Sequence, residues 1–341
     1  MRKQARTADA GLREFQIGTD FGSDALLAGI CETTKRLIDD QRPGRVNLRK
    51  GDVDVDSAIA PTNRLPIGVA IRSIRAEPGW WLESARRLDA AGYDSIWCWD
   101  HFMGAGDPTV PVVECWTILS MTAAATERVR VAPFVINVMN RHPAVLARMA
   151  STLQIASGGR LILGIGIGGH PKEHRAYGID FPEAKERAAR LEEAIGVMRA
   201  LSSGGPVTRE SPYYPLANAA AFPVPNPAPP IVIGAETATG ARLAGRNGVG
   251  LSAFDTTFEK ILPLYLEALD AAGYRRQDQL VIVGFQGESN WGGDYAVGEA
   301  EWCREPRAAW ERWHEAGADA AVVLARTTAD VDVLVDAVAR W

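Results

Sequence analysis

The chain has 341 residues, of which 47% are hydrophobic and 23% charged, values that are ordinary for a soluble globular protein. Its 37 basic and 42 acidic residues give a net charge of −5, which argues against a general nucleic-acid binder or a protein of anionic membrane surfaces. Its apolar runs fall short of the roughly 18 residues that a membrane span needs. Four scattered cysteines without a CxxC pair favour reduced thiols, and together these features predict a cytoplasmic protein.

Residues 1–64 differ in pattern from the rest of the chain. They contain one modest amphipathic stretch, Ser23–Asp40, but no strand alternation and no apolar face large enough for a core. The alternating aspartates of GDVDVD at 51–56 resemble a Ca²⁺ loop, but its glycine and its final glutamate are missing. We therefore expect an N-terminal extension of low order over 1–64 and a folded domain over 65–341.

From Leu65 onward, short apolar runs alternate with segments of helical periodicity. The predicted strands are Pro66–Ile71, Asp94–Trp99, Val129–Val138, Leu161–Ile167, Pro230–Ile233, Val249–Ala253, Leu280–Val283 and Ala320–Leu324. The predicted helices are Pro78–Ala91, Pro111–Thr126, Ala144–Ala156, Pro182–Leu201, Thr237–Arg246, Phe258–Ala272, Glu305–Ala316 and Ala329–Arg340. The Pro- and Gly-rich stretch Ser202–Pro230 is predicted to be an irregular surface insertion. Eight strand–helix pairs predict an α/β fold, a single (β/α)8 TIM barrel, with a doubly wound sheet as the alternative.

In such barrels the active site lies at the C-terminal ends of the strands, so the residues that follow each strand are the candidates. The second strand ends in Asp100 and His101, a pair that could supply a base, an acid or a metal ligand. The third strand ends in Asn137, whose amide suits a hydrogen bond to the edge of a heterocycle. The plainer interpretations, a surface pair at a turn and a strand end that becomes polar, stay open at this point.

The fourth strand runs into GIGIGG at Gly164–Gly169, which satisfies the GxGxxG pattern. A dinucleotide site needs that turn to open directly into a helix, whereas His170, Pro171 and a loop are expected to intervene here. Close backbone approach to a flat ligand is the favoured interpretation, because glycine removes the side chains in the way. His170 and His174 have the spacing of helical metal ligands, but no third ligand is placed, and we predict no metal.

The fifth strand runs into a helix through Gly234, Ala235, Glu236 and Thr237. Backbone N–H groups and a hydroxyl at a helix N-terminus can cradle a phosphate. The carboxylate of Glu236 counts against this cradle unless it points away from it.

Several segments in order resemble the bacterial luciferase-like oxidoreductases: DAAGYDSIWCWDHF at 89–102, the stretch from PVVECW to GIGIG at 111–168, ARLEEAIGVMRAL at 189–201 and PPIVIGA at 229–235. The resemblance runs from about Pro66 to the C-terminus and leaves 1–64 uncovered. It implies a (β/α)8 barrel that uses reduced FMN with O₂ for monooxygenation, or the deazaflavin coenzyme F420 for hydride transfer. The motifs WCWDHF and VECWTIL are closer to the deazaflavin branch.

The resemblance also implies that Asp100 and His101 are the family's acid–histidine pair. His101 would be the base on the substrate hydroxyl in a deazaflavin reaction, or would stabilise the oxygen adduct or its proton in a flavin reaction. The acid that some dehydrogenases carry in the glycine stretch is replaced here by Gly169 or His170, which counts against a sugar-phosphate dehydrogenase.

The cofactor residues that the resemblance implies fall in three groups. The strand whose backbone packs against the ring system, often with a non-prolyl cis bond, corresponds to Val135, Ile136 and Asn137. The glycines beside the ring correspond to Gly166 and Gly168. The loop at the phosphate end corresponds to Gly234, Ala235, Glu236 and Thr237.

We expect a small-molecule substrate, a homodimer as in related barrels, and a separate flavin reductase if the cofactor is FMN. Two alternatives from other classes stay open. One is a non-catalytic flavin-binding barrel. The other is a metal-dependent barrel hydrolase that uses Asp100, His101 and His142.

Overall fold

The computed structural model describes residues 65–104, 106–284 and 296–341. The predicted N-terminal extension over 1–64, with its alternating aspartates, lies outside the described residues. Among the helices that are described, none combines the length and the apolarity needed to cross a membrane.

The parallel strands are β1 (Ile67–Ile71), β2 (Ser95–Cys98), β3 (Arg130–Pro133), β4 (Ile136–Asn137), β5 (Leu163–Gly166), β8 (Ile231–Gly234), β9 (Gly250–Phe254), β10 (Val281–Gly284) and β11 (Ala320–Ala325). The α-helices are α2 (Pro78–Ala91), α3 (Cys115–Ala125), α4 (Pro143–Ala156), α5 (Pro171–Tyr177), α6 (Ala184–Ser202), α7 (Ala238–Arg246), α8 (Asp255–Ala271), α9 (Glu301–Arg304), α10 (Pro306–Glu315) and α11 (Thr328–Ala337). Within the described ranges, short 3₁₀ turns lie at Arg276–Asp278, Val297–Glu299 and Val338–Arg340.

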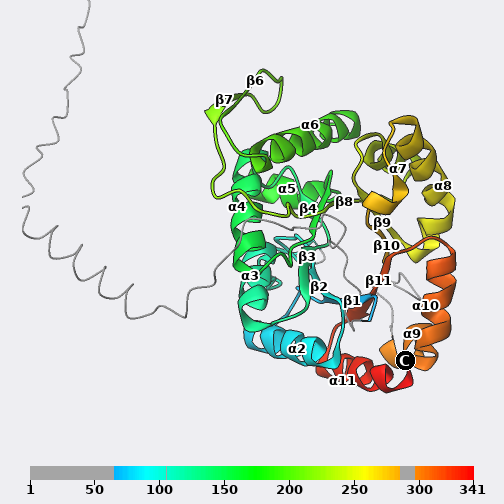
Figure 1. Ribbon diagram of the computed structural model, residues 1–341. Coiled ribbons are helices and arrows are strands. Elements are labelled where there is room, and N and C mark those ends of the chain that lie inside the picture. The colour runs from blue at the N-terminus through cyan, green and yellow to red at the C-terminus, as the bar shows by residue number, and fades with distance from the viewer. Residues whose placement is uncertain (1–64, 105, 285–295) are drawn as a thin grey trace, which may run out of the picture. The chain divides into compact units, whose positions relative to one another are not determined.

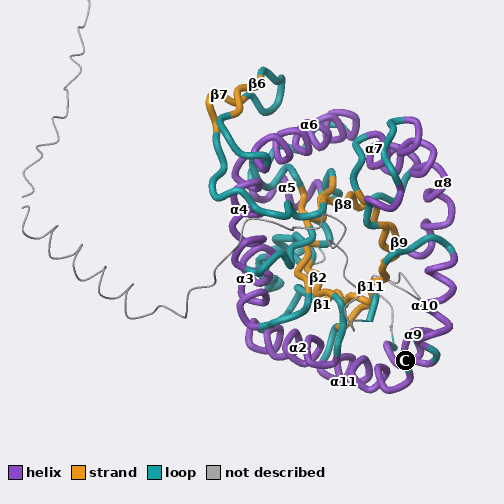
Figure 2. The backbone as a smooth tube through the Cα atoms, viewed as in Figure 1, coloured by secondary structure: helices purple, strands orange, loops and turns teal. Residues whose placement is uncertain are grey.

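The parallel strands form a ring with the helices outside it (Figures 1 and 2), in the order β3-β2-β1-β11-β10-β9-β8-β5-β4. The predicted third strand is split in two, because β3 pairs with β2 while β4 pairs with β5, and the Phe134–Val135 peptide between them is cis. A parallel bridge between Val131 and Leu161 brings β3 beside the start of β5 and closes the ring. With β3 and β4 counted as one position, the nine strands fill eight positions in chain order, which confirms the (β/α)8 barrel.

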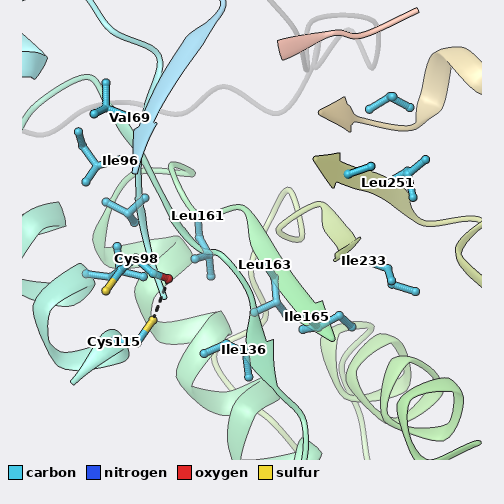
Figure 3. Close-up of a cluster of buried hydrophobic side chains, with 14 of the residues drawn as sticks. Val69, Ile96, Cys98, Cys115, Ile136, Leu161, Leu163, Ile165, Ile233 and Leu251 are labelled. Carbon is cyan, nitrogen blue, oxygen red and sulfur yellow. Dashed lines mark hydrogen bonds between the residues drawn. The ribbon is translucent and has the colours of Figure 1, made fainter. Parts of the chain in front are cut away.

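Alternate residues of each strand fill the inside of the ring, and the others pack outward against the helices. Outward residues such as Val69, Ile96 and Leu163 belong to the main core (Figure 3). The inward cluster consists of Ala70, Trp97, Trp99, Ala132, Ile162, Val232, Ile282, Ala320 and Val322. Because side chains fill the interior, a ligand site has to lie at a rim of the barrel.

Two segments differ from the predicted ones. A helix, α5, occupies the place after the glycines where a loop is expected; Pro171 begins it, and Gly178 ends it in a left-handed conformation with φ of 66°. The stretch Ser202–Pro230, predicted to be irregular, contains the antiparallel pair β6 (Val207–Arg209) and β7 (Leu216–Ala219). The pair lies outside the ring of strands, near α4 and α6 in Figure 1.

Packing between α7 and α8 gives a test of the fold. A Cβ at Gly245 would lie 2.5 Å from the carbonyl oxygen of Tyr265 and 2.8 Å from the amide nitrogen of Leu269. Because both are backbone atoms, we expect Gly245→Ala to lower the free energy of unfolding by about 1–3 kcal/mol, measured by urea unfolding. Gly79→Ala in α2 is the matched control, since nothing lies within 4 Å of its Cβ position. Equal loss of stability in both variants would contradict this packing.

Candidate functional site

A cavity of about 240 Å³ opens at the C-terminal ends of the strands, the rim where the sequence predicts the site. This volume lies just below the range of about 300–1,000 Å³ that is typical of small-molecule sites, so it suits a ring system better than a whole cofactor. The predicted residues that line the cavity are Asp100, His101, Val135, Asn137, Gly166, Gly168 and Gly234. The predicted residues outside its lining are Ile136, Ala235, Glu236 and Thr237.

The carboxylate of Asp100 is fully buried and engaged on both oxygens. It accepts the backbone N–H of Asn137 at 3.0 Å and the side-chain amide of Asn140 at 3.2 Å. The Arg141 guanidinium donates to both of its oxygens, at 2.9 and 2.8 Å, and reaches Glu114 with its other terminal nitrogen. Asp100 therefore ties the end of β2 to the segment that follows β4, which makes it a positioning group.

The carboxylate that contacts the His101 ring is that of Glu173, and not that of its chain neighbour Asp100. Nδ1 of His101 lies 3.2 Å from Oε2 of Glu173, whose side chain is 5% exposed, while the His101 side chain is 22% exposed. With Nδ1–H donating to the carboxylate, Nε2 is the nitrogen that can accept a proton. The ring of His170 packs edge-on against His101, with centroids 4.4 Å apart. The structure thus forms a histidine–carboxylate pair of the kind used in proton transfer.

Glu173 escaped the sequence prediction because α5 was expected to be a loop. The local signal was present: Pro171 stands at the first helical position, an acid follows in the first turn, and Gly178 ends the helix. This pattern predicts a short helix, but it carries no information on which strand end the helix faces. That placement depends on the closed ring.

The surroundings of Glu173 and His170 shift the pKa values of both side chains. Burial alone would raise the pKa of Glu173, but its hydrogen bonds with the His101 ring and the Phe102 backbone and its electrostatic attraction to the neighbouring imidazoles outweigh burial, so the pKa lies below the usual 4.5. Burial and the neighbouring His101 lower the pKa of His170 below its usual 6.5. At neutral pH the site therefore holds an ionised carboxylate and a neutral His170.

Most hydrogen-bonding groups of the Asn137 side chain are occupied by other groups of the protein. Its amide nitrogen lies 3.2 Å from Oδ1 of Asn140 and 2.6 Å from Nε2 of His174, and its oxygen accepts the N–H of Met139. Nδ1 of His174 lies 3.1 Å from the carbonyl oxygen of Asp180, so His174 donates there and accepts from Asn137. The backbone N–H of Asn137 donates to Asp100 and its carbonyl oxygen accepts the N–H of Asn140. Hence the predicted contact of Asn137 with a heterocycle edge is left to the remaining lone pairs of its two oxygens.

The glycines of the cavity make room for the backbone segment between β3 and β4. A Cβ at Gly166 would lie 2.7 Å from a methyl group of Val135, and one at Gly234 would lie 3.0 Å from the other. Gly168 has φ of 75°, and a Cβ there would meet the Asn137 amide at 2.6 Å. A Cβ at 166 or 168 would therefore force its neighbours to move, and one at 234 would make a tight contact with Val135. The same absence of side chains leaves a smooth backbone wall.

In the predicted phosphate loop, residues 234–237, some of the polar groups already form hydrogen bonds within the protein. Thr237 caps α7 by accepting the N–H of Gly240 at 3.2 Å. The Glu236 carboxylate accepts the N–H of Phe254 at 3.0 Å and the hydroxyl of Thr257, so it serves the start of α8. Glu236 therefore turns away from the loop, which removes the objection that the sequence raised against a phosphate there.

A metal centre finds no support in the part of the chain that the structure describes. Within it, no three His, Cys, Asp or Glu side chains come together in a way that could hold a metal ion. His142, which the hydrolase alternative uses, caps α4 by accepting the N–H of Ala144 at Nδ1. His174 is occupied by Asn137 and Asp180.

Comparison with known proteins gives a consistent set of similarities. The family model of luciferase-like monooxygenases matches residues 60–287. The F420-dependent glucose-6-phosphate dehydrogenase of Kineococcus radiotolerans is 35% identical over 217 residues, which are 61% of this chain and 64% of that protein. The phthiodiolone/phenolphthiodiolone dimycocerosates ketoreductase of Mycobacterium kansasii is 36% identical over 167 residues, 43% of this chain and 44% of that one. This chain thus spans less than two thirds of these relatives.

Among solved structures, an F420-dependent secondary alcohol dehydrogenase in complex with an F420–acetone adduct is similar in fold. Its TM-score is 0.70 at 22% identity, with 80% of this chain and 98% of that chain covered. At this level of identity the similarity concerns the barrel itself.

The depressed pKa of Glu173 predicts a pH-dependent contribution to stability. A carboxyl group with a lowered folded-state pKa stabilises the protein above its unfolded pKa, and that stabilisation is lost as the pH falls through the folded value. We expect Glu173→Gln to lower the free energy of unfolding by about 1–2 kcal/mol near pH 6 and by progressively less toward pH 3. Urea unfolding of both proteins across this range measures the difference. A difference that grows on acidification would contradict the assignment.

Proposed function

The chain belongs to the luciferase-like monooxygenase family, and within it we propose an oxidoreductase that uses the deazaflavin coenzyme F420, with FMN as the alternative cofactor. One observation carries the proposal: His101, held by the buried carboxylate of Glu173, lines a cavity whose lining includes the glycines at 166, 168, 169 and 234. The relatives at 35% and 36% identity, an F420-dependent dehydrogenase and a ketoreductase, favour hydride transfer over oxygenation.

The lining of the cavity fits the flat ring of such a cofactor. Gly166 and Gly234 present backbone with Val135 packed against them, and these three residues would hold the ring. A Cβ at Gly169 would meet nothing within 4 Å, so the space beside it is open. When bound, the deazaflavin would take up a hydride from the substrate carbon.

The chain's own residues then handle the proton and the geometry. Nε2 of His101 would accept the proton of the substrate hydroxyl. Glu173 would keep the opposite nitrogen protonated and stabilise the imidazolium that forms. Asp100, through Arg141 and the N–H of Asn137, holds the end of β2 and thereby the position of His101.

The remaining parts of the proposal concern domains, substrate and partners. We assign residues 65–341 to one catalytic domain and 1–64 to an extension outside it, in a cytoplasmic protein.

Glucose 6-phosphate is a candidate substrate because the relatives are named for it. Gly169 and His170 count against a sugar-phosphate substrate, because some dehydrogenases have an acid at this place. A homodimer is supported by exposed apolar side chains on α3 and α4, namely Met121, Val145 and Ile155. A separate flavin reductase is needed only with FMN.

Cofactor binding tests the proposal directly. Coenzyme F420 and FMN are titrated separately into the purified full-length protein, and the quenching of cofactor fluorescence is measured. We expect saturable quenching with F420 and weaker or no quenching with FMN, because the relatives favour the deazaflavin. Tighter binding of FMN would move the reaction to the monooxygenase alternative. Binding of neither cofactor would falsify the proposed function.

Substitution of His101 separates an enzyme from a non-catalytic flavin-binding barrel. With a panel of secondary alcohols and glucose 6-phosphate, we expect His101→Ala to lower kcat by about 10²–10⁴-fold while F420 still binds, because only proton transfer is lost. A non-catalytic barrel shows no activity to lose.

Asp100→Asn is the matched variant for a positioning role. Because it breaks a buried ion pair, we expect a loss of about 3 kcal/mol in stability, accompanied by weaker cofactor binding. Unchanged stability together with a kcat loss as large as that of His101→Ala would instead make Asp100 the catalytic acid of the sequence prediction.

A further inference from the structure

Two arginines directly follow the ends of two neighbouring strands, β1 and β11, at the mouth of the barrel. Ala70 of β1 and Val322 of β11 point into the ring, where Leu324 packs against the same inward cluster. Because side chains alternate along a strand, the next inward positions are Arg72 and Arg326. The pairing of the two strands continues to this level, since the N–H of Arg72 donates to the carbonyl oxygen of Ala325 at 2.9 Å.

The guanidinium of Arg72 is not neutralised by the described residues. Its Nε is buried without a hydrogen-bond partner, and no carboxylate of the described part forms an ion pair with it. Burial lowers the pKa of Arg72, and repulsion by Arg326 and Arg75 lowers it further. Asp330 opposes this effect, but its carboxylate already accepts the N–H groups of Arg326 and Thr327 at the start of α11.

A partly buried guanidinium beside other cations, with no carboxylate partner among the residues that the structure describes, is costly to maintain. The cost is recovered when an oxyanion binds, because the planar fork of arginine matches the geometry of carboxylates and phosphates. Arg72 also lies close enough to His101 for one substrate to contact both residues. β1 lies beside β2, with Ala70 opposite Trp97, so Arg72 stands level with Trp99, two residues before His101. Adjacent strands are about 4.8 Å apart, so a small molecule can reach from His101 to Arg72.

We propose that Arg72, with Arg326 beside it, binds an oxyanion of the substrate, a phosphate or a carboxylate, on the β1–β11 side of the mouth. The substrate class is therefore anionic, and its anionic group is held apart from the carbon that reacts near His101. This inference rests on the proposed function, because it places the substrate in the same mouth as the cofactor.

The test is calorimetric titration of inorganic phosphate, and separately of acetate, into the full-length protein saturated with F420. Arg72→Gln removes the charge, and Arg72→Lys keeps the charge without the fork. Arg86→Gln, at an exposed arginine of α2 that pairs with Glu83, is the control for net charge. We expect Arg72→Gln to weaken binding about tenfold or more, Arg72→Lys to restore part of it, and Arg86→Gln to leave it unchanged.

Either anion supports the inference, and the tighter one identifies the substrate's anionic group as phosphate or carboxylate. Two results overturn it: no binding of either anion to the unmodified protein, or equal binding to Arg72→Gln and Arg86→Gln. Loss of F420 affinity in Arg72→Gln also overturns it, because Arg72 would then hold the cofactor's own phosphate. If F420 itself does not bind, the titrations are run on the cofactor-free protein, so that failure of the proposed function is seen separately from failure of this inference.

Discussion

The geometry of the site depends on the buried ion pair between Asp100 and Arg141. An ionised carboxylate without access to water is tolerated only when its lone pairs are filled, and here the guanidinium, an amide side chain and a backbone N–H fill them. These donors come from the last residue of β4 and from the segment directly after it, so the contacts of Asp100 join the end of β2 to the end of β4. The residue that follows Asp100 is His101, whose backbone position is set by the same anchor.

The second constraint is one of space. The segment between β3 and β4 enters the mouth of the barrel, and Val135 occupies volume that side chains at 166 and 234 would need. Glycine at these positions therefore serves two purposes, since it admits Val135 and leaves a backbone wall for a planar ligand. The first two glycines of the GxGxxG pattern, Gly164 and Gly166, are explained by packing against Pro133 and Val135, whereas the Cβ position of Gly169 is open.

The charges around the mouth are arranged asymmetrically. On one side, Glu173 is ionised and holds an imidazole, which suits a group that takes up a proton. On the other side, Arg72 and Arg326 directly follow the neighbouring strands β1 and β11, where we propose that Arg72 binds an oxyanion of the substrate. A substrate with a hydroxyl at one end and an anion at the other would be oriented by the two sides together. Such orientation lowers the entropic cost of bringing the reacting groups together.

The sequence by itself determined the order of strands and helices, the barrel, the rim that carries the candidate site, and half of the residues that line the cavity. These properties are encoded locally, because apolar periodicity assigns each residue to a face and parallel βα repeats place all strand ends on one rim. Only the tertiary structure decided which groups pair across that rim. Glu173 is 72 residues from His101 in the chain, and Arg72 and Arg326 directly follow β1 and β11. Such pairs form only when the ring closes, so no local pattern along the chain specifies them.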